Sequence, residues 1–220
     1  MKKYQVQQIS AESFKFTTNS YQLVGSLLLL HNVDEMESGV YNYDYKDKVV
    51  LDVGGFEGDS AVFFWSKGAR KVVVYEPVVE HHLVICENIC LNSVVAEVYS
   101  AGIGVGDGVR VVAYDKIDLG FGLEPEGSLN SLSIEIRDVS RVIVESGADV
   151  AKFDCEGAEI SLISVSAETL RQLEYVIVEF HSRQIRRQLV EKFESSGFVV
   201  HYDIDHGSDD PISLIHFKRV

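Results

Sequence analysis

A buried strand that runs directly into a glycine-rich turn and a helix is the feature that most constrains this sequence. Residues 49–53 (VVLDV) form an almost continuous apolar run, which is typical of a strand covered on both faces of a parallel sheet. The turn GGFEG follows at 54–58, and a helical stretch over 59–67 ends at Gly68. A strand, a tight turn and a helix in this order predict the first unit of an α/β domain.

The same alternation continues along the chain. It predicts strands at 71–76, 95–100, 150–154 and 175–180, helices at 80–91, 138–146 and 182–196, and a terminal antiparallel pair at 198–204 and 212–218. Short strands at 109–114 and 131–136 flank the segment 120–127, which we interpret as a lid because glycines stand at both of its ends. We therefore predict a doubly wound, mostly parallel α/β domain over 46–220, with a short helical extension or cap over 1–45.

The composition of the chain restricts the kinds of molecule that it is expected to bind. The chain has 220 residues and a net charge of −14, which argues against nucleic acid and against an anionic membrane surface. Its longest apolar run, residues 23–30, is far shorter than the ~20 residues that a membrane span needs. We expect a soluble cytoplasmic protein. The run Leu27–Leu30 leaves two options open, because it can pack within the chain or on a second subunit of a homodimer.

Three cysteines are too few for a disulfide framework. Cys86 and Cys90 share one face of a predicted helix, but there is no second pair and no histidine at ligand spacing. We expect these two side chains to pack in the core and expect no zinc site.

The charge of the glycine turn favours one type of cofactor. Asp52 stands two residues before the first glycine and Glu57 lies inside the turn. A diphosphate there would be repelled by about 4 kcal/mol per charge at ~4 Å and an effective dielectric of ~20. S-adenosylmethionine has an ammonium group, a sulfonium and no phosphate, so we predict this cofactor and disfavour an NAD-dependent oxidoreductase. Glu76 ends the second strand 76 − 54 = 22 residues after Gly54, where an acidic side chain can accept ribose hydroxyls.

A bland alternative stays open for each of these residues. The glycines can simply form a tight turn, and Glu76 can be a solvated carboxylate at the end of a strand.

A second group of polar residues follows two later strands. Asp154, Glu156 and Glu159 follow the strand at 150–154, and Glu179 and His181 end the strand at 175–180. Because parallel strands end at one edge of a sheet, we expect these five side chains to converge. Glu156, and after it His181, are the candidate general bases, and Asp154 is the candidate for positioning cofactor or substrate.

Other roles for this group also stay open. Glu159 can instead cap a helix, which is worth ~0.3–1 kcal/mol. We predict no metal at this site, with a divalent cation held by Asp154, Glu156 and Glu179 as the alternative.

Four stretches of the sequence together resemble one family. They are Val50-Leu51-Asp52-Val53-Gly54-x-x-x-Gly58-Asp59, Tyr75-Glu76-Pro77, Lys152-x-Asp154-x-Glu156-Gly157-x-Glu159 and Glu179-x-His181. From about Tyr41 to the end, the chain is similar to the FkbM-type family of class I S-adenosylmethionine-dependent methyltransferases. The resemblance implies a Rossmann-like seven-stranded sheet with a reversed last strand.

The resemblance also implies an activity and a set of binding residues. It implies methyl transfer, most often to a hydroxyl of a sugar or small natural product. Asp52, Gly54 and Gly58 would border the methionine part, Glu76 the ribose, and Asp154 the methyl group. Gly55 and Asp59 complete the expected cofactor set. The sequence departs from the family at Gly55-Phe56-Glu57, where members usually carry Ala-Asn-x.

We therefore expect an enzyme that methylates a hydroxyl of a small molecule or sugar. An RNA or protein methyltransferase, or a non-catalytic cofactor-binding protein of the same fold, is the alternative. Methylation of a base amino group by an Asn/Asp-Pro-Pro-aromatic motif is excluded, because the only prolines are Pro77, Pro125 and Pro211.

Overall fold

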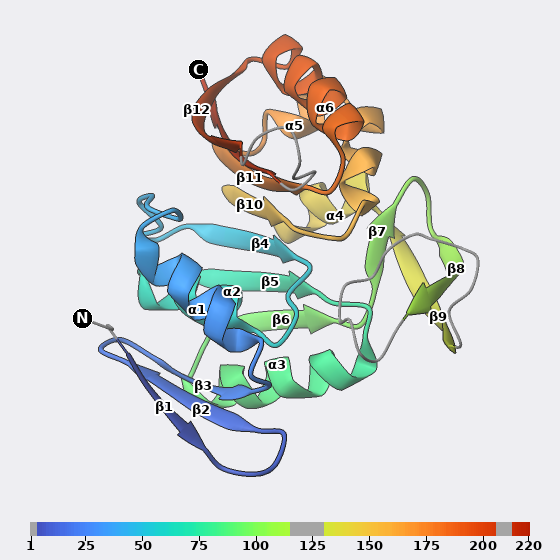
Figure 1. Ribbon diagram of the computed structural model, residues 1–220. Helices are drawn as coiled ribbons and strands as arrows, with labels where there is room; N and C mark the ends of the chain where they lie inside the picture. The colour runs from blue at the N-terminus through green and yellow to red at the C-terminus, as the bar shows by residue number, and fades with distance from the viewer. Residues whose placement is uncertain (1–3, 115–129, 206–212) are drawn as a thin grey trace. The chain divides into compact units, whose positions relative to one another are not determined.

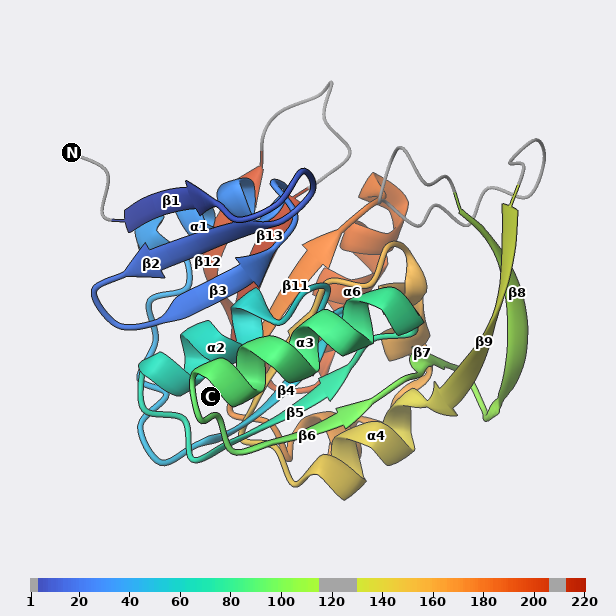
Figure 2. The same cartoon turned by 90° about the horizontal axis from the view of Figure 1, so that it is seen from below.

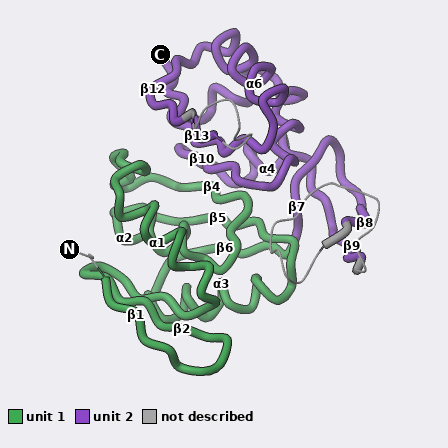
Figure 3. Tube along the Cα trace, viewed as in Figure 1, with its two compact units in different colours: residues 1–100 green, residues 101–220 purple. Residues whose placement is uncertain are grey.

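The computed structural model describes residues 4–114, 130–205 and 213–220. The chain divides into two compact units, Met1–Ser100 and Ala101–Val220, shown in green and purple in Figure 3. Each unit has its own sheets and helices, labelled in Figure 1, and each is described by itself.

Unit 1 contains the predicted strand–turn–helix repeat. Strands β4 (Val49–Val53), β5 (Lys71–Tyr75) and β6 (Ala96–Tyr99) are parallel neighbours in that order. Helices α2 (Asp59–Ser66) and α3 (Val79–Leu91) pack on these strands, and Figure 2 shows both helices on the same face. Every residue of β4 is buried, as its apolar run predicts.

The N-terminal segment differs from the predicted helical extension. It is a three-stranded antiparallel sheet of β1 (Tyr4–Gln8), β2 (Phe14–Thr18) and β3 (Gln22–Gly25), followed by helix α1 (Leu29–Ser38). The helix begins only after Gly25-Ser26, where the strand ends. Its buried residues Leu29, Val33 and Met36 follow helical spacing. Strands β1 (YQVQQ) and β2 (FKFTT) each begin with four alternating apolar and polar residues, a strand signal that the prediction of a helical extension overlooked.

Two asparagines of α3 hold the free edge of β3. The Asn88 side chain accepts a hydrogen bond from Val24 N at 2.7 Å and donates to Val24 O at 2.8 Å. One helical turn later, Asn92 makes the same pair of bonds to Gln22 N and O, at 2.9 and 2.6 Å. The side-chain amides thus take the place of a neighbouring strand, which satisfies backbone groups at the edge of the sheet.

Unit 2 contains four further strands of the main sheet. Their order is β12 (Phe198–Asp205), β13 (Ser213–Arg219), β11 (Tyr175–Phe180) and β10 (Val150–Phe153). The last strand, β13, is antiparallel to both of its neighbours, whereas β10 and β11 are parallel. With the three parallel strands of unit 1, these make the seven predicted strands, and the predicted reversal of the last strand is confirmed.

Helices and a small second sheet complete unit 2. The helices are α4 (Val139–Ser146), the 3-10 helix η1 (Ala158–Ser164), α5 (Ala167–Leu170) and α6 (Arg183–Ser195). The second sheet has the order β7 (Gly102–Gly104), β9 (Asn130–Asp138) and β8 (Gly108–Tyr114), so the predicted short strands on either side of the lid segment are confirmed. The segment 120–127 itself lies outside the described residues.

The structure shows the exposure of the two cysteines of α3 and of the Leu27–Leu30 run. Cys86 and Cys90 are exposed, so the prediction that they pack in the core is wrong. They lie on the side of α3 opposite the buried residues His81, Ile85 and Asn88. In the Leu27–Leu30 run, Leu27 and Leu28 are exposed while Leu29 is buried.

Among the described residues, no helix combines the length and apolarity needed to cross a membrane.

Candidate functional site

The glycine turn of unit 1 lies directly on strand β5. Gly54 N and Gly55 N both donate to Tyr75 O, at 2.9 and 3.3 Å. Gly54 and Gly58 have φ of +83° and +85°, a region that glycine adopts without penalty. A Cβ on Gly55 would lie 2.3 Å from Val74 Cγ1. Close packing against β5 therefore explains the second glycine, whatever the turn binds.

Two of the predicted acidic cofactor ligands are buried on either side of this turn. Asp52 on β4 is fully buried, and Ser60 Oγ donates to its Oδ2 at 2.5 Å. Asp59 is buried at the first turn of α2, where the helix dipole stabilises a negative charge. The sequence placed both carboxylates beside the glycines, but it did not identify Ser60 as a partner.

Glu76, the predicted ribose ligand, braces the turn. Its Oε2 accepts a hydrogen bond from Phe56 N and its Oε1 accepts one from Val78 N, both at 2.9 Å. The residue is only 5% exposed, and His81 Nδ1 lies 3.5 Å from Oε1. A carboxylate oxygen has two lone pairs, so each oxygen can still accept a second bond. Glu76 can therefore brace the turn and accept ribose hydroxyls at the same time.

Phe56 and Glu57, within the stretch where the sequence differs from the family, both point to other parts of unit 1. The Phe56 ring packs edge-on against His81, with ring centroids 4.6 Å apart. The buried Glu57 accepts a hydrogen bond from Ser26 N at 2.8 Å, and burial raises the pKa of its carboxyl. Its negative charge is thus engaged by the segment after β3. The charge argument against a diphosphate now rests on Asp52 alone, because NAD-binding sites also carry an acidic residue at the position of Glu76.

The turn after β10 in unit 2 carries the second acidic group. Lys152 Nζ donates to Asp154 Oδ2 at 2.9 Å, an ion pair whose lysine is buried. Glu156 has φ of +52°, an unfavourable value for a residue with a side chain, and Gly157 follows at +95°. Glu159, the second residue of η1, is fully buried and accepts a hydrogen bond from Gly157 N at 2.7 Å.

His181, directly after β11, joins this turn through Glu159. Its backbone N donates to Glu159 Oε1 at 3.1 Å, and its ring Nδ1 lies 3.3 Å from the same oxygen. The opposite ring nitrogen, Nε2, lies 3.4 Å from a Glu156 oxygen, 3.7 Å from Glu179 and 3.9 Å from Asp154. The structure thus brings together all five polar residues that the sequence placed at these two strand ends.

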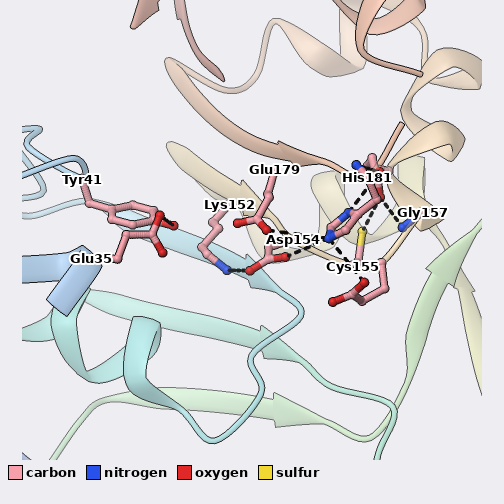
Figure 4. Close-up of polar contacts among 10 residues, drawn as sticks. Glu35, Tyr41, Lys152, Asp154, Cys155, Gly157, Glu179 and His181 are labelled. Atoms are coloured by element: carbon pink, nitrogen blue, oxygen red, sulfur yellow. Dashed lines mark hydrogen bonds and ion pairs between the residues drawn. The ribbon is translucent and has the colours of Figure 1, made fainter. Parts of the chain in front are cut away.

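Figure 4 shows how the side chains of this group are directed. Asp154 and Glu179 point toward His181, and Lys152 reaches Asp154 from strand β10. The sequence did not identify Lys152 as part of the site, although it stands two residues before Asp154 and so on the same face of the strand. The helix-cap alternative for Glu159 describes only part of its role, because its carboxylate also holds His181.

The carboxylates determine the charge of the histidine. Burial alone would lower the pKa of His181. The hydrogen bond to Glu159 and the negative charges of Glu156, Glu159 and Asp154 outweigh burial and raise this pKa to about 9. Burial raises the pKa of Glu156, while the positive charge of His181 opposes that shift. At neutral pH, His181 is therefore a cation among carboxylates.

The geometry of this group also bears on the metal alternative. One ligand atom from each of Asp154, Glu156 and His181 can be chosen so that all three lie within 4.8 Å of one another. His181 thus stands where the sequence alternative placed Glu179. Oxygen and imidazole ligands together suit several divalent cations, so this set could hold a metal.

Comparisons with known proteins find similar structures but no matching sequence family. No family model matches the sequence, and no curated protein matches it, so membership of the FkbM-type family stays a prediction. The chain is similar to the structure of SMU.776, a proposed methyltransferase complexed with SAH, with a TM-score of 0.60 and 11% identity over 96% of this chain and 57% of that one.

Two further structures cover more of their own length. M. jannaschii TYW2 in complex with AdoMet has a TM-score of 0.53 and 12% identity over 98% of this chain and 90% of that chain. PH1948 from Pyrococcus horikoshii, a proposed RNA methyltransferase, has a TM-score of 0.52 and 16% identity over 87% and 85%. The chain therefore has the Rossmann-like fold of these proteins, two of which were solved with the predicted cofactor or its demethylated product.

Proposed function

We propose that this chain is an S-adenosylmethionine-dependent methyltransferase. The observation that carries the proposal is the pair of buried acidic residues, Asp52 and Glu76, at the ends of adjacent strands beside a glycine turn. The fold is shared with structures complexed with AdoMet and SAH, which supports the same cofactor here. The charge of Asp52 suits a cofactor with an ammonium group and disfavours a diphosphate, and Glu76 suits an unsubstituted ribose.

The residues of unit 1 fit this cofactor. Gly54 and Gly58 keep side chains out of the turn, and Glu76 has lone pairs left for ribose hydroxyls. Asp52 and Asp59 supply negative charge near the turn. Gly55 meets a packing requirement against β5. When bound, S-adenosylmethionine supplies an electrophilic methyl group with a neutral thioether as its leaving group.

The residues of unit 2 supply the groups that prepare an acceptor. Glu156 is the base that takes the acceptor proton, because its raised pKa makes it a stronger base than an ordinary carboxylate. His181 is protonated at neutral pH, so it holds Glu156 in place 3.4 Å away rather than acting as the base. Asp154, oriented by Lys152, positions the acceptor. Alignment of the acceptor can supply about 7–11 kcal/mol and a general base about 10²–10⁴-fold.

We propose a hydroxyl of a small molecule or sugar as the acceptor. A hydroxyl must lose its proton during transfer, which gives the carboxylates a chemical task. RNA is the second candidate, because one similar structure is a proposed RNA methyltransferase. The net charge of −14 opposes binding to a phosphate backbone, so we place RNA behind the small molecule.

Calorimetric titration with S-adenosylmethionine, S-adenosylhomocysteine and NAD tests the cofactor. We expect the two adenosyl ligands to bind and NAD not to bind. Glu76→Gln removes one carboxylate oxygen and should weaken S-adenosylhomocysteine binding by about 10- to 150-fold, the equivalent of a charge-assisted hydrogen bond worth ~1.5–3 kcal/mol. Glu80→Gln, at an exposed position of α3, is the matched control and should bind normally. Binding of NAD alone, or of none of the three, contradicts the proposal.

Methyl transfer itself is tested with labelled S-adenosylmethionine and a panel of hydroxylated acceptors and RNA. Glu156→Gln should lower kcat by about 10²–10⁴-fold and leave the affinity for S-adenosylhomocysteine unchanged. Glu168→Gln, at an exposed position of α5, is the control. Unchanged turnover in Glu156→Gln would exclude this residue as the base.

A further inference from the structure

Glu159 is the most enclosed charged residue of the acidic group in unit 2. Its exposed fraction is 0%, whereas Asp154, Glu156 and Glu179 have side chains that are 29%, 40% and 21% exposed. A substrate can therefore reach those three carboxylates, but Glu159 itself has no surface to offer. Its influence on any reaction must pass through the groups that it holds.

Those groups come from the ends of two strands. Oε2 of Glu159 accepts from Gly157 N at 2.7 Å, within the turn after β10. Oε1 accepts from the backbone N of His181 at 3.1 Å and faces its ring Nδ1 at 3.3 Å, directly after β11. A single carboxylate thus ties the end of β10 to the end of β11. The Cys155 thiol also donates to Oε2, at 3.9 Å. An ionised carboxylate has enough acceptor sites for all four donors, but a neutral amide has only one oxygen.

The hydrogen bond between Glu159 and the imidazole ring determines how the two ring nitrogens of His181 are directed. A carboxylate only accepts hydrogen bonds, so the ring nitrogen that faces Glu159 must carry a proton. This leaves Nε2 directed at Glu156, Glu179 and Asp154. The Nδ1 contact is a hydrogen bond of 3.3 Å, whereas the Nε2 contacts are ion pairs of 3.4 to 3.9 Å, so we infer that a neutral ring keeps its proton on Nδ1.

The hydrogen bond from Gly157 N to Glu159 acts on the backbone next to Glu156. Glu156 and Gly157 are both in the left-handed region, at φ of +52° and +95°, which is unfavourable for a residue with a side chain. Such a conformation persists only where the surroundings hold it. Glu159 fixes the amide that directly follows Glu156, so it also holds the turn that aims the Glu156 carboxylate at His181.

We propose that Glu159 is a positioning residue that sets the ring orientation and tautomer of His181 and the backbone turn of Glu156, and so holds in place the base that takes the acceptor proton. The inference rests on the proposed methyltransferase function for its catalytic consequence. Its structural part, the tautomer of His181, is independent of that function and can be measured in the free protein.

The substitution Glu159→Gln tests the proposal because an amide cannot accept from both sides. If its oxygen faces Gly157, its NH₂ group meets His181, and Nδ1 must then become an acceptor. If the amide is turned the other way, its NH₂ group opposes Gly157 N and the turn loosens. In either orientation the arrangement of Glu156 and His181 is altered, with almost no change in side-chain volume.

Nitrogen-15 NMR of the imidazole ring supplies the first readout, with the His181 signal identified by its loss in His181→Gln. In the wild type above the ring pKa, we expect the remaining proton on Nδ1. In Glu159→Gln we expect either a neutral ring with the proton on Nε2 or, if the turn loosens instead, a changed backbone amide signal of Gly157. A Glu159→Gln spectrum that is identical to the wild type at both positions overturns the proposal.

Kinetics supply the second readout. Glu159→Gln should lower kcat at least about tenfold while its affinity for S-adenosylhomocysteine stays within about twofold of the wild type. Glu168→Gln should change neither value. An altered ring signal with unchanged kcat also overturns the proposal, because Glu159 then has no effect on the reaction. If the amide variant fails to fold, Glu159→Asp keeps the charge, shortens its reach by one methylene, and should still shift the ring signal.

Failure of the proposed function would look different. In that case neither variant nor wild type binds S-adenosylmethionine, yet the ring tautomer of wild-type His181 still reports whether Glu159 sets it.

Discussion

Replacing Asn88 with alanine should destabilise unit 1 far more than the same change at Asn92. Asn88 is fully buried and makes three hydrogen bonds, to Val24 N, Val24 O and Glu57 O, at 2.7, 2.8 and 2.8 Å. Asn92 also makes three bonds with its side chain, to Gln22 N, Gln22 O and Asn88 O, but it is half-buried. The two asparagines thus form a natural pair with matched chemistry and different burial.

The expected loss of unfolding free energy in Asn88→Ala follows from the backbone groups that lose their hydrogen-bond partner. In Asn88→Ala, Glu57 O loses its partner in a buried setting, and an unsatisfied buried group costs about 1–3 kcal/mol. The Val24 groups are half-buried, so we assign them the lower value of about 1 kcal/mol each. Alanine returns at most about 0.7 kcal/mol of helix propensity. The net loss is about 3 kcal/mol, which corresponds to a fall in Tm of about 6–12 °C for a chain of this size.

Asn92→Ala should cost only about 1 kcal/mol, because water can reach the groups that it exposes. Urea unfolding followed by the fluorescence of Trp65 measures both variants. Trp65 is the only tryptophan of the chain and lies in α2, so it reports on unit 1. Equal losses in the two variants, or a loss below about 1 kcal/mol in Asn88→Ala, would refute the argument that the buried amide closes the edge of β3.

Two further predictions concern stability. Burial, together with the charge of His201, lowers the pKa of His216 from 6.5 to about 4, so its contribution to stability is complete above pH 6.5 and is lost as the pH falls toward 4. The shift of 6.5 − 4 = 2.5 units amounts to about 3 kcal/mol, and urea unfolding between pH 7 and 4.5 should show a shallower loss in His216→Gln than in the wild type. Gly55→Ala should cost about 1–3 kcal/mol, because the new Cβ would lie 2.3 Å from Val74 Cγ1. Gly108→Ala, where no atom lies within 4 Å, should cost little, and equal melting temperatures for the two variants would contradict this reasoning.

The main sheet could be predicted because its signals are local. Each predicted strand from residue 49 onward is a short apolar or alternating run bounded by glycine, proline or polar turns, and the described strands begin and end within about two residues of those bounds. The terminal antiparallel pair followed from the alternation of two neighbouring segments, whereas the reversal of the last strand was implied by the family resemblance. Helix α3 was predicted over 80–91 and is observed over Val79–Leu91.

Strand β3 of the N-terminal sheet could not be predicted in this way, because the side chains that complete its edge lie far along the chain. Asn88 reaches Val24 across 64 residues, and Asn92 reaches Gln22 across 70. In the sequence these asparagines are ordinary polar residues of a helix. A strand whose edge is completed by side chains of a distant helix has no local pattern that reveals it.

The acidic group of unit 2 was predicted in part. Strand ends and charge were enough to bring Asp154, Glu156 and His181 together, because parallel strands end at one edge. The role of Glu159 could not be read, because a carboxylate after a strand looks the same whether it faces solvent or is buried. Burial, which the sequence does not state, separates the residue that holds the site from those that can touch a substrate.

Glu76 shows why binding and folding must be measured together in the glycine turn. Its two oxygens already brace Phe56 and Val78, and the same oxygens are the proposed ribose acceptors. Removing one oxygen therefore takes away a bond in the free protein as well as a bond to the ligand. A fall in affinity that is matched by a similar fall in unfolding free energy would assign Glu76 to the turn alone. A fall in affinity that exceeds the loss of stability would assign it to the ligand, because only that part of the loss depends on the ribose.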